Sequence, residues 1–218
     1  MKTPALVDVS VLLIFFNRPD TFGQVFEQVR KARPSRLFLY QDGARGPQDR
    51  DGIEACRRIA DGVDWDCEVY KLYQEKNLGC NPSGYIAHKW AFSLTDKCIV
   101  LEDDVVPSVS FFAFCKEMLD RYEHDERLGM IAGFNPEEQS ECDGDYLFNS
   151  NFSIWGWASW RRVVDKWDEN YAFLRNPYAL SCLNEIIRER KMRRDFLYRC
   201  RRHCCHNLSM FPPALRLP

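Results

Sequence analysis

The sequence predicts an α/β fold, in which a mostly parallel sheet is flanked by helices and a ligand site lies at the carboxyl ends of the strands. Short apolar runs alternate with amphipathic segments, which is typical of strand–helix–strand units. The first run, Val9–Phe16, is apolar at nearly every position, as expected for a strand buried on both faces. Polar residues follow the ends of several strands, and ligands bind at that edge of open α/β sheets.

The first half of the chain alternates strands and helices. The strand Val9–Phe16 stops before Pro19, which favours a turn, and Asp20 or Thr21 is expected to cap a helix that runs to about Ala32. The next expected elements are a strand at Leu37–Tyr40, a charged helix around Asp49–Asp61, a strand at Cys67–Tyr73 and a helix that ends near Leu94.

The second half begins with a strand, Lys97–Leu101, that runs into three acidic residues. The elements expected after it are a helix from Ser108 to about Tyr122, strands at Leu128–Phe134 and Tyr146–Phe152, and a helix at Trp157–Trp167. The chain is basic between Arg188 and His203 and ends in a proline-containing segment. We therefore divide it into a ligand-binding domain, residues 1–175, and a helical, basic, partly irregular tail, residues 176–218.

Composition and charge exclude several classes of protein. Hydrophobic residues make up 45% of the chain and its net charge is −2, which fits a globular domain and gives no overall attraction to nucleic acid. No apolar run approaches the ~18 residues of a transmembrane helix, and the N-terminus lacks the features of a secretory signal. We therefore expect a soluble cytoplasmic protein with reduced cysteines. Peripheral membrane contact stays open, and the oligomeric state is not indicated.

Glu102, Asp103 and Asp104 follow directly after a buried strand. Three adjacent carboxylates repel one another, which raises their pKa values unless a cation neutralises them. Oxygen ligands suit Mn²⁺ or Mg²⁺, which proteins hold by one or two carboxylates together with substrate phosphates. An isolated acidic triplet more often caps the following helix. Its position among other polar strand ends favours a metal site here.

Four segments together resemble the GT-A glycosyltransferases. They are Val11–Pro19 ending in Asn-Arg-Pro, the loop Gln41-Asp42-Gly43, the run Val100-Leu101-Glu102-Asp103-Asp104 followed by Pro107 and Phe111-Phe112, and Trp155-Gly156-Trp157-Ala158-Ser159-Trp160-Arg161-Arg162. The similarity covers about Val9 to Asp168. It is greatest to bacterial nucleotide-sugar transferases related to the N-acetylglucosaminyltransferase that starts complex N-glycan processing.

The resemblance implies a metal-dependent, inverting transfer of a sugar from a nucleotide-sugar donor, expected to be a UDP-sugar, to a carbohydrate acceptor. It also implies a role for each matched residue. The nucleotide would be bound by Asn17, Arg18, Asp42 at the uracil, and Asp103; Mn²⁺ or Mg²⁺ by Asp104 and Asp103; and the sugar and acceptor by Glu102, Trp155, Gly156 and Trp157.

Each assignment has a simpler competitor. Arg18 could be a solvated loop residue, Asp42 before Gly43 is a common turn pair, and the tryptophans could be core residues alone. Asn77-Leu78-Gly79 reads as an ordinary turn. His88 is expected to be a packed or surface residue. The Cys and His residues of the tail lack the spacing of a zinc site.

The general base that an inverting transferase needs is not identified. In the family it is an acidic residue between tryptophans, downstream of the Gly-Trp segment, and no such segment follows Trp167. Asp165, Asp168 and Glu169 read as surface charges. We therefore expect that the chain ends early or has an altered C-terminus.

Two other functions stay open. One is a domain that binds nucleotide sugar without turnover, which the missing base favours. The other, ranked last, is a sugar nucleotidyltransferase. That enzyme should carry a Gly-rich, basic phosphate loop after the first strand, where this chain has Asn17-Arg18-Pro19-Asp20.

Overall fold

A mixed six-stranded sheet forms the centre of the molecule, with the strand order β3-β2-β1-β4-β6-β5. This computed structural model describes residues 2–134, 144–149 and 153–204. The strands are β1 (Val7–Phe15), β2 (Pro34–Gln41), β3 (Glu68–Tyr73), β4 (Lys97–Glu102), β5 (Ile131–Ala132) and β6 (Trp157–Trp160). β1 to β4 pair in parallel, whereas β6 pairs antiparallel with β4 and β5. The mostly parallel α/β sheet predicted from the sequence is confirmed.

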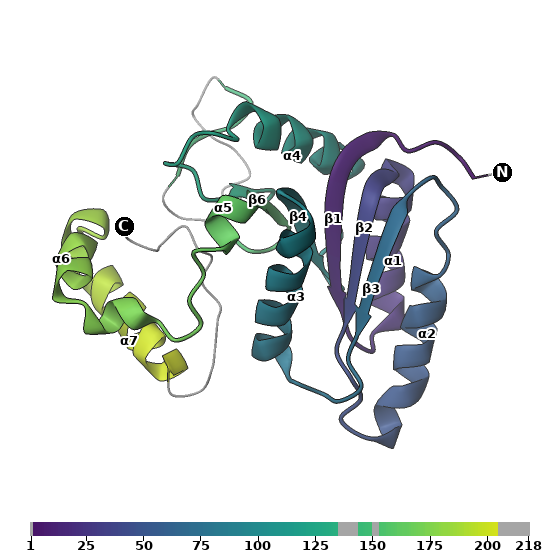
Figure 1. The fold of residues 1–218 in the computed structure, drawn as a ribbon, viewed down its shortest axis with the longest axis horizontal. Helices are drawn as coiled ribbons and strands as arrows, with labels where there is room; N and C mark the ends of the chain where they lie inside the picture. Colours follow the sequence, from purple (N-terminus) through teal and green to yellow (C-terminus); the bar gives the residue numbers. More distant parts are fainter. Residues whose placement is uncertain (1, 135–143, 150–152, 205–218) are drawn as a thin grey trace.

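Helices cover both faces of the sheet (Figure 1). They are α1 (Pro19–Ala32), η1 (Pro47–Asp49), α2 (Arg50–Ala60), α3 (Cys80–Leu94), α4 (Val109–Arg121), α5 (Arg161–Val164), η2 (Ala172–Arg175), α6 (Pro177–Ile186) and α7 (Arg190–Cys204). α1, α2 and α4 pack on one face and α3 on the other, because they share buried clusters with opposite sides of β1. No helix of the described residues is long and apolar enough to cross a membrane.

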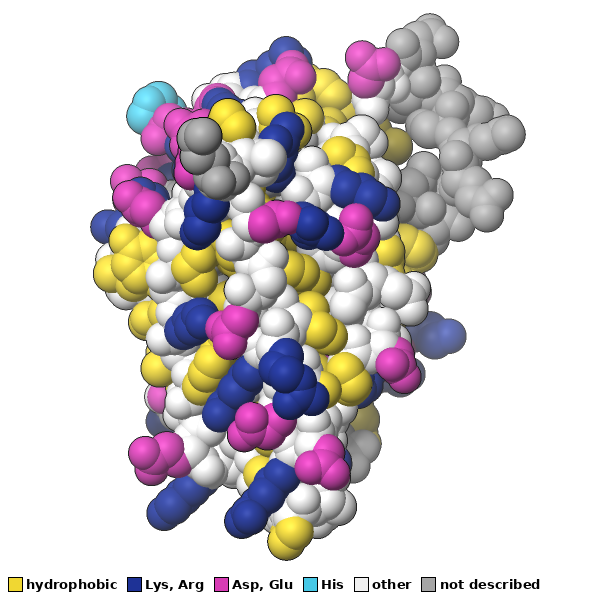
Figure 2. Space-filling view, turned by 90° about the vertical axis from the view of Figure 1, so that its right-hand side faces the viewer, with side chains coloured by type: hydrophobic (Ala, Val, Ile, Leu, Met, Phe, Trp, Pro, Cys, Tyr) yellow, Lys and Arg dark blue, Asp and Glu magenta, His cyan; other side chains and the backbone are white. Residues whose placement is uncertain are grey.

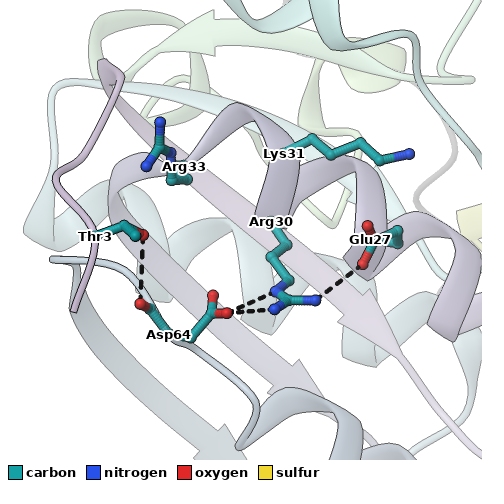
Figure 3. Close-up of a pocket in the computed structure, with 6 residues that line it drawn as sticks. All are labelled: Thr3, Glu27, Arg30, Lys31, Arg33 and Asp64. Carbon is teal, nitrogen blue, oxygen red and sulfur yellow. Dashed lines mark hydrogen bonds and ion pairs between the residues drawn. The ribbon is translucent and has the colours of Figure 1, made fainter. Parts of the chain in front are cut away.

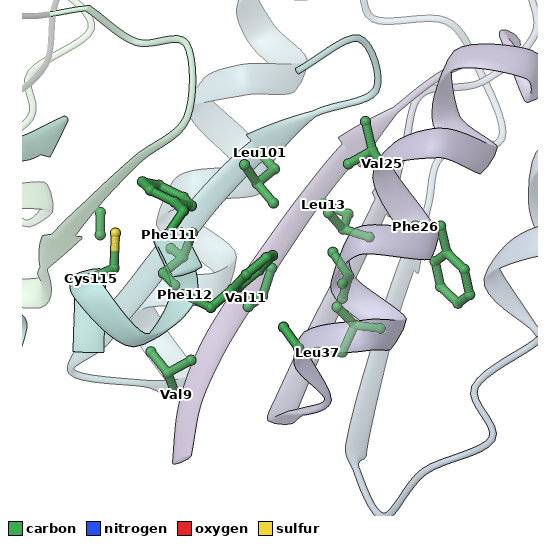
Figure 4. Close-up of a cluster of buried hydrophobic side chains, with 14 of the residues drawn as sticks. Val9, Val11, Leu13, Val25, Phe26, Leu37, Leu101, Phe111, Phe112 and Cys115 are labelled. Atoms are coloured by element: carbon green, nitrogen blue, oxygen red, sulfur yellow. The ribbon is translucent and has the colours of Figure 1, made fainter. Parts of the chain in front are cut away.

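β1 supplies side chains to both cores, as its almost unbroken apolar sequence predicts. Val9, Val11 and Leu13 point toward α1 and α4, where they meet Val25 and Phe112 (Figure 4). Leu12 points to the other face and packs with residues of α3. The helices present apolar residues at helical spacing, and α1 buries Phe22, Val25, Phe26, Val29 and Ala32.

The C-terminal helices have a small buried cluster of their own, made by Tyr171, Leu183, Phe196 and Cys200. In Figure 1, α6 and α7 lie beside the sheet rather than over either of its faces. The cysteines in the described residues form no disulfide, and Cys56, Cys98, Cys115 and Cys200 are buried. On the side shown in Figure 2, basic and acidic side chains are interspersed, so this side offers no single-sign surface to a polyanion.

Three sequence-based expectations need correction. The helix expected at Trp157–Trp167 is wrong, because Trp157–Trp160 forms the buried strand β6 and only Arg161–Val164 is helical. The large aromatic residues are buried by pairing beside β4, a long-range contact that local spacing does not reveal. The strand expected at Leu128–Phe134 is reduced to Ile131–Ala132. Of the strand expected at Tyr146–Phe152, residues 146–149 are not extended in a sheet, and residues 150–152 lie outside the described residues.

The start of α1 also differs from the expectation. The helix begins at Pro19, whose fixed φ suits a first helical position, so the N-cap is Arg18 rather than Asp20 or Thr21. Arg18 makes no side-chain cap. The Thr21 hydroxyl instead donates to the Arg18 carbonyl at 3.3 Å.

His88 on α3 is a packed histidine, which is one of the two alternatives that the sequence left open. Its ring stacks on Trp157 at a centroid distance of 5.2 Å and lies 5.2 Å from the ring of Trp167. Burial lowers the pKa of His88 from 6.5 to about 4, because the charged ring would lose its hydration. The hydrogen bond between Nδ1 and the Gly84 carbonyl opposes this shift.

This shift predicts a loss of stability in mild acid. The folded pKa of His88 lies below the unfolded value, so the unfolded chain binds more protons as the pH falls from 6.5 toward 4. At pH 5 we expect a contribution of about 2 kcal/mol against the folded state. We expect the free energy of unfolding in urea to differ less between pH 7 and pH 5 in His88→Phe than in the wild type. Phenylalanine keeps an aromatic ring at this position but cannot bind a proton. An equal pH dependence in both proteins would contradict a buried neutral His88.

Candidate functional site

The predicted site residues lie at one edge of the sheet, where β1, β2 and β4 end. β1 pairs with β2 on one side and with β4 on the other. The crossover helices α1 and α3 lie on opposite faces of the sheet. The connections therefore diverge between β1 and β4, and such a switch point leaves a crevice outside the carboxyl ends of the strands. Arg18 follows β1, and Asp103 and Asp104 follow β4, on the two sides of this point.

Arg18 joins the two strand ends by contacts with both aspartates. Its Nη2 and Nε donate to Asp103, the second at 3.4 Å, and its Nη1 donates to Asp104 Oδ2 at 3.0 Å. The main-chain N–H of Phe16 also donates to Asp103 Oδ2, at 3.2 Å. Asp103 is buried, with 4% of its side chain exposed, whereas the side chains of Arg18 and Asp104 are 52% and 45% exposed. The hydrogen bond to Asp103 raises the pKa of Arg18.

Glu102, the first residue of the triplet, lies in a different setting. Partial loss of hydration raises the pKa of its carboxyl group although the residue is exposed, and the charges of Asp104 and Asp103 raise it further. Cys80 is the first residue of α3. Partial loss of hydration raises the pKa of its thiol, and the nearby charges of Glu102 and Asp42 raise it further. The start of α3 therefore borders the same edge, as expected for a helix that follows a parallel strand.

The acidic strand end offers few oxygen ligands to a divalent ion. Among the described residues, no three side chains of His, Cys, Asp or Glu converge on one point that could hold a metal. Both oxygens of Asp103 accept hydrogen bonds from Arg18 or Phe16. Asp104 is half-exposed and accepts from Arg18 through Oδ2. One carboxylate fits an ion that takes its remaining ligands from substrate phosphates and water.

Asp42 fixes the loop that precedes α3. Its Oδ1 accepts the N–H groups of Gly43 at 2.8 Å and Leu78 at 2.9 Å. Its Oδ2 accepts the Asn77 side-chain amide at 2.9 Å and the Gly79 N–H at 3.0 Å. Asn77, read as an ordinary turn residue from sequence, is thus a direct partner of Asp42. A uracil bound by Asp42 would have to share an oxygen that already accepts two hydrogen bonds.

Asn17 belongs to a second network at the same edge. Its side-chain amide donates to Asp49 Oδ1 at 2.7 Å, and Asp49 also pairs with Arg45. This pairing lowers the pKa of Asp49 to about 2. The Arg45 guanidinium lies over the Phe16 ring, 5.0 Å from its centroid. Arg45 and Asp49 were not predicted as site residues from the sequence. They are four positions apart in the segment after β2, and this spacing of opposite charges indicates an ion pair.

The Trp155–Trp157 segment reaches this edge because β6 runs antiparallel to β4. Trp157 pairs with Val100 and is buried, so it belongs to the core. Gly156 has φ +73°, and an added Cβ would lie 3.6 Å from Leu101 and 3.5 Å from Val105. Trp155 is 60% exposed and meets Phe134 edge to face, with centroids 4.8 Å apart. Of the two predicted pocket tryptophans, only Trp155 offers its ring to a ligand.

A shallow hollow of about 330 Å³ lies at the opposite end of the sheet (Figure 3). It is lined by Thr3, Glu27, Arg30, Lys31, Arg33 and Asp64. These residues come from the C-terminal end of α1 and from segments near the start of β2. Arg30 pairs with Asp64 and Glu27 there. The hollow is therefore separate from the edge that holds the predicted site.

No family model matches the chain, and no curated protein matches it. Among solved structures, the 4-diphosphocytidyl-2C-methyl-D-erythritol synthase of Anaerococcus prevotii is similar to it. The sequence identity is 9%, the alignment covers 72% of this chain and 74% of that chain, and the TM-score is 0.41. A likeness of this size carries no argument about function.

Proposed function

We propose that the chain is a nucleotide-sugar-binding domain of the GT-A type that transfers a sugar, with UDP-sugar as donor and a carbohydrate as acceptor. The observation that carries the proposal is the meeting of Arg18, Asp103 and Asp104 at the switch point between β1 and β4. Ligands of open α/β sheets bind at such a point. The half-exposed guanidinium of Arg18 and the half-exposed carboxylate of Asp104 offer partners to a diphosphate and to a divalent ion, respectively.

Each part of the edge has a role in this proposal. Arg18, half-exposed, binds the diphosphate, while the Asp42 loop and Asn17 border the nucleoside. Asp104 would hold Mn²⁺ or Mg²⁺, and such an ion would supply positive charge to stabilise the departing nucleoside diphosphate. Trp155 offers an aromatic face to the sugar or acceptor, because its ring is 60% exposed beside the edge. Glu102 directly precedes Asp103 and Asp104, whose charges help to raise the pKa of its carboxyl group, and in this proposal it borders the sugar and acceptor.

A binding-only domain is the second candidate, and one observation favours it. Asp168, a carboxylate considered for the base, uses its oxygens to accept the N–H groups of Asn170 and Ala172. It therefore caps the turn that leads into η2. Asp165 and Glu169 are exposed on the same segment. Asp168 is thus engaged by its own turn, which favours a domain without this general base.

Release of UDP from a panel of UDP-sugars, measured with Mn²⁺ and with and without short oligosaccharide acceptors, separates the candidates. A transferase releases UDP faster when its acceptor is present. A binding-only domain binds UDP but releases none from the donor. A nucleotidyltransferase instead forms pyrophosphate from a nucleoside triphosphate and a sugar phosphate, and this product would overturn the proposal.

A further inference from the structure

Arg18 occupies the space between the two aspartates to which the resemblance assigns the metal. Its guanidinium contacts Asp103 through Nη2 and Nε and Asp104 through Nη1. A guanidinium is a planar, permanently charged group that can satisfy two carboxylates at once. The acidic strand end therefore already has a cation, supplied by the chain itself from the end of the neighbouring strand.

The two ends of this contact differ in strength. Asp103 is buried, and the Phe16 N–H fixes its Oδ2 in addition to Arg18. Asp104 is 45% exposed and is held by one hydrogen bond of 3.0 Å. Exposed ion pairs contribute little to stability because water competes for both partners. The Asp103 contact is thus the fixed end, and the Asp104 contact is the end that can be exchanged.

We propose that Arg18 is an internal counter-cation that competes with a divalent ion for Asp104 and moves to the diphosphate when nucleotide and ion bind together. This inference rests on the proposed function. It makes Asp103 a positioning residue, which anchors Arg18, rather than a metal ligand. An exchange of partners is expected because a diphosphate accepts two parallel N–H bonds from a guanidinium. This exchange of partners would also reduce the repulsion between Arg18 and the incoming ion, because the negatively charged phosphate oxygens would screen the two cations from each other.

Loss of the Arg18 charge should therefore move two affinities in opposite directions. Without the guanidinium, Asp104 is free and no cation repels the ion, so Mn²⁺ alone binds more tightly. Without the guanidinium, the diphosphate loses its bidentate partner, so UDP in the presence of Mn²⁺ binds more weakly. A residue that only supports the fold would weaken both, and a residue outside the site would change neither.

Calorimetry with MnCl₂ alone and with UDP at saturating Mn²⁺ tests this on the wild type, Arg18→Gln and Arg18→Lys. We expect Arg18→Gln to raise the affinity for Mn²⁺ alone about tenfold and to lower that for UDP about tenfold. Arg18→Lys keeps the charge beside the buried Asp103 but cannot bridge two carboxylates, so its Mn²⁺ affinity should rise by less. If Arg18→Gln does not fold, as judged by thermal melting, Arg18→Lys decides the question.

Arg30→Gln is the matched control. Arg30 is 48% exposed and also pairs with two carboxylates, Asp64 and Glu27, but it lies at the opposite end of the sheet (Figure 3). It should leave both affinities unchanged. Unchanged or weaker binding of Mn²⁺ alone in both Arg18 variants would overturn the competition. If the wild type does not bind UDP, the proposed function and the move to the diphosphate are wrong, while the Mn²⁺ arm still decides whether Arg18 competes with the ion.

Discussion

Replacing Asp104 by Ala is expected to abolish the metal-dependent part of nucleotide binding. Asp104 is the half-exposed carboxylate of the acidic strand end, whereas Asp103 is buried and engaged by Arg18 and Phe16. An ion that bridges protein and diphosphate would lose its protein ligand. We expect the affinity for UDP in Mn²⁺ to fall by about a hundredfold, which corresponds to about 2.7 kcal/mol. Calorimetry with and without Mn²⁺ measures the change.

Asp64→Ala is the control for this prediction. Asp64 is 49% exposed and pairs with Arg30, so it matches Asp104 in exposure and in its arginine partner. It lies at the far end of the sheet and should leave UDP affinity unchanged. Unfolding in urea should show that neither substitution lowers stability much, because both ion pairs are exposed. If Asp104→Ala binds UDP in Mn²⁺ as tightly as the wild type does, Asp104 is not a ligand of the metal.

Replacing Asp42 by Ala is expected to have the largest effect on stability among the polar site residues. Only 7% of Asp42 is exposed, and its two oxygens accept four hydrogen bonds, three from the loop before α3 and one from the neighbouring Gly43 N–H. Removing the carboxylate leaves these donors in a poorly hydrated place, where unpaired polar groups are unfavourable. We expect a loss of about 3 kcal/mol in the free energy of unfolding. The loop between β3 and α3 should also become accessible to proteases.

Two further variants make the Asp42 result specific. Asp42→Asn keeps one oxygen but turns an amide toward donors such as the Gly79 N–H, so a smaller loss is expected. Asp66→Ala removes an exposed aspartate and should change stability by less than about 0.5 kcal/mol. A loss in Asp42→Ala no greater than that in Asp66→Ala would show that the four hydrogen bonds do not hold the loop.

The first four strands and the helices between them could be predicted because their signals are local. Apolar runs such as Val9–Phe16 mark buried strands, and the turn residues Asn17-Arg18-Pro19 mark the boundary before the next helix. The same pattern placed the polar residues at one edge, because parallel strands all end on the same side. The sequence could not indicate that Trp157–Trp160 is a strand, since this depends on antiparallel pairing with β4.

The contacts within the site were also beyond the sequence. Residue types alone suggest that three adjacent carboxylates gather around one ion. In the structure, burial separates their roles, because Asp103 turns inward to Arg18 and the Phe16 N–H while Asp104 stays half-exposed. The pairing of Asp42 with Asn77 joins positions that are 35 residues apart. Such partners follow from the strand order, which brings the ends of β2 and β3 together.

The most direct test of the central claim is calorimetric titration of the wild-type chain with UDP, in the presence and absence of Mn²⁺. We expect saturable binding that is much tighter with Mn²⁺ than without it, with one UDP bound per chain. Absence of UDP binding under both conditions would contradict the assignment of this sheet edge to a nucleotide sugar.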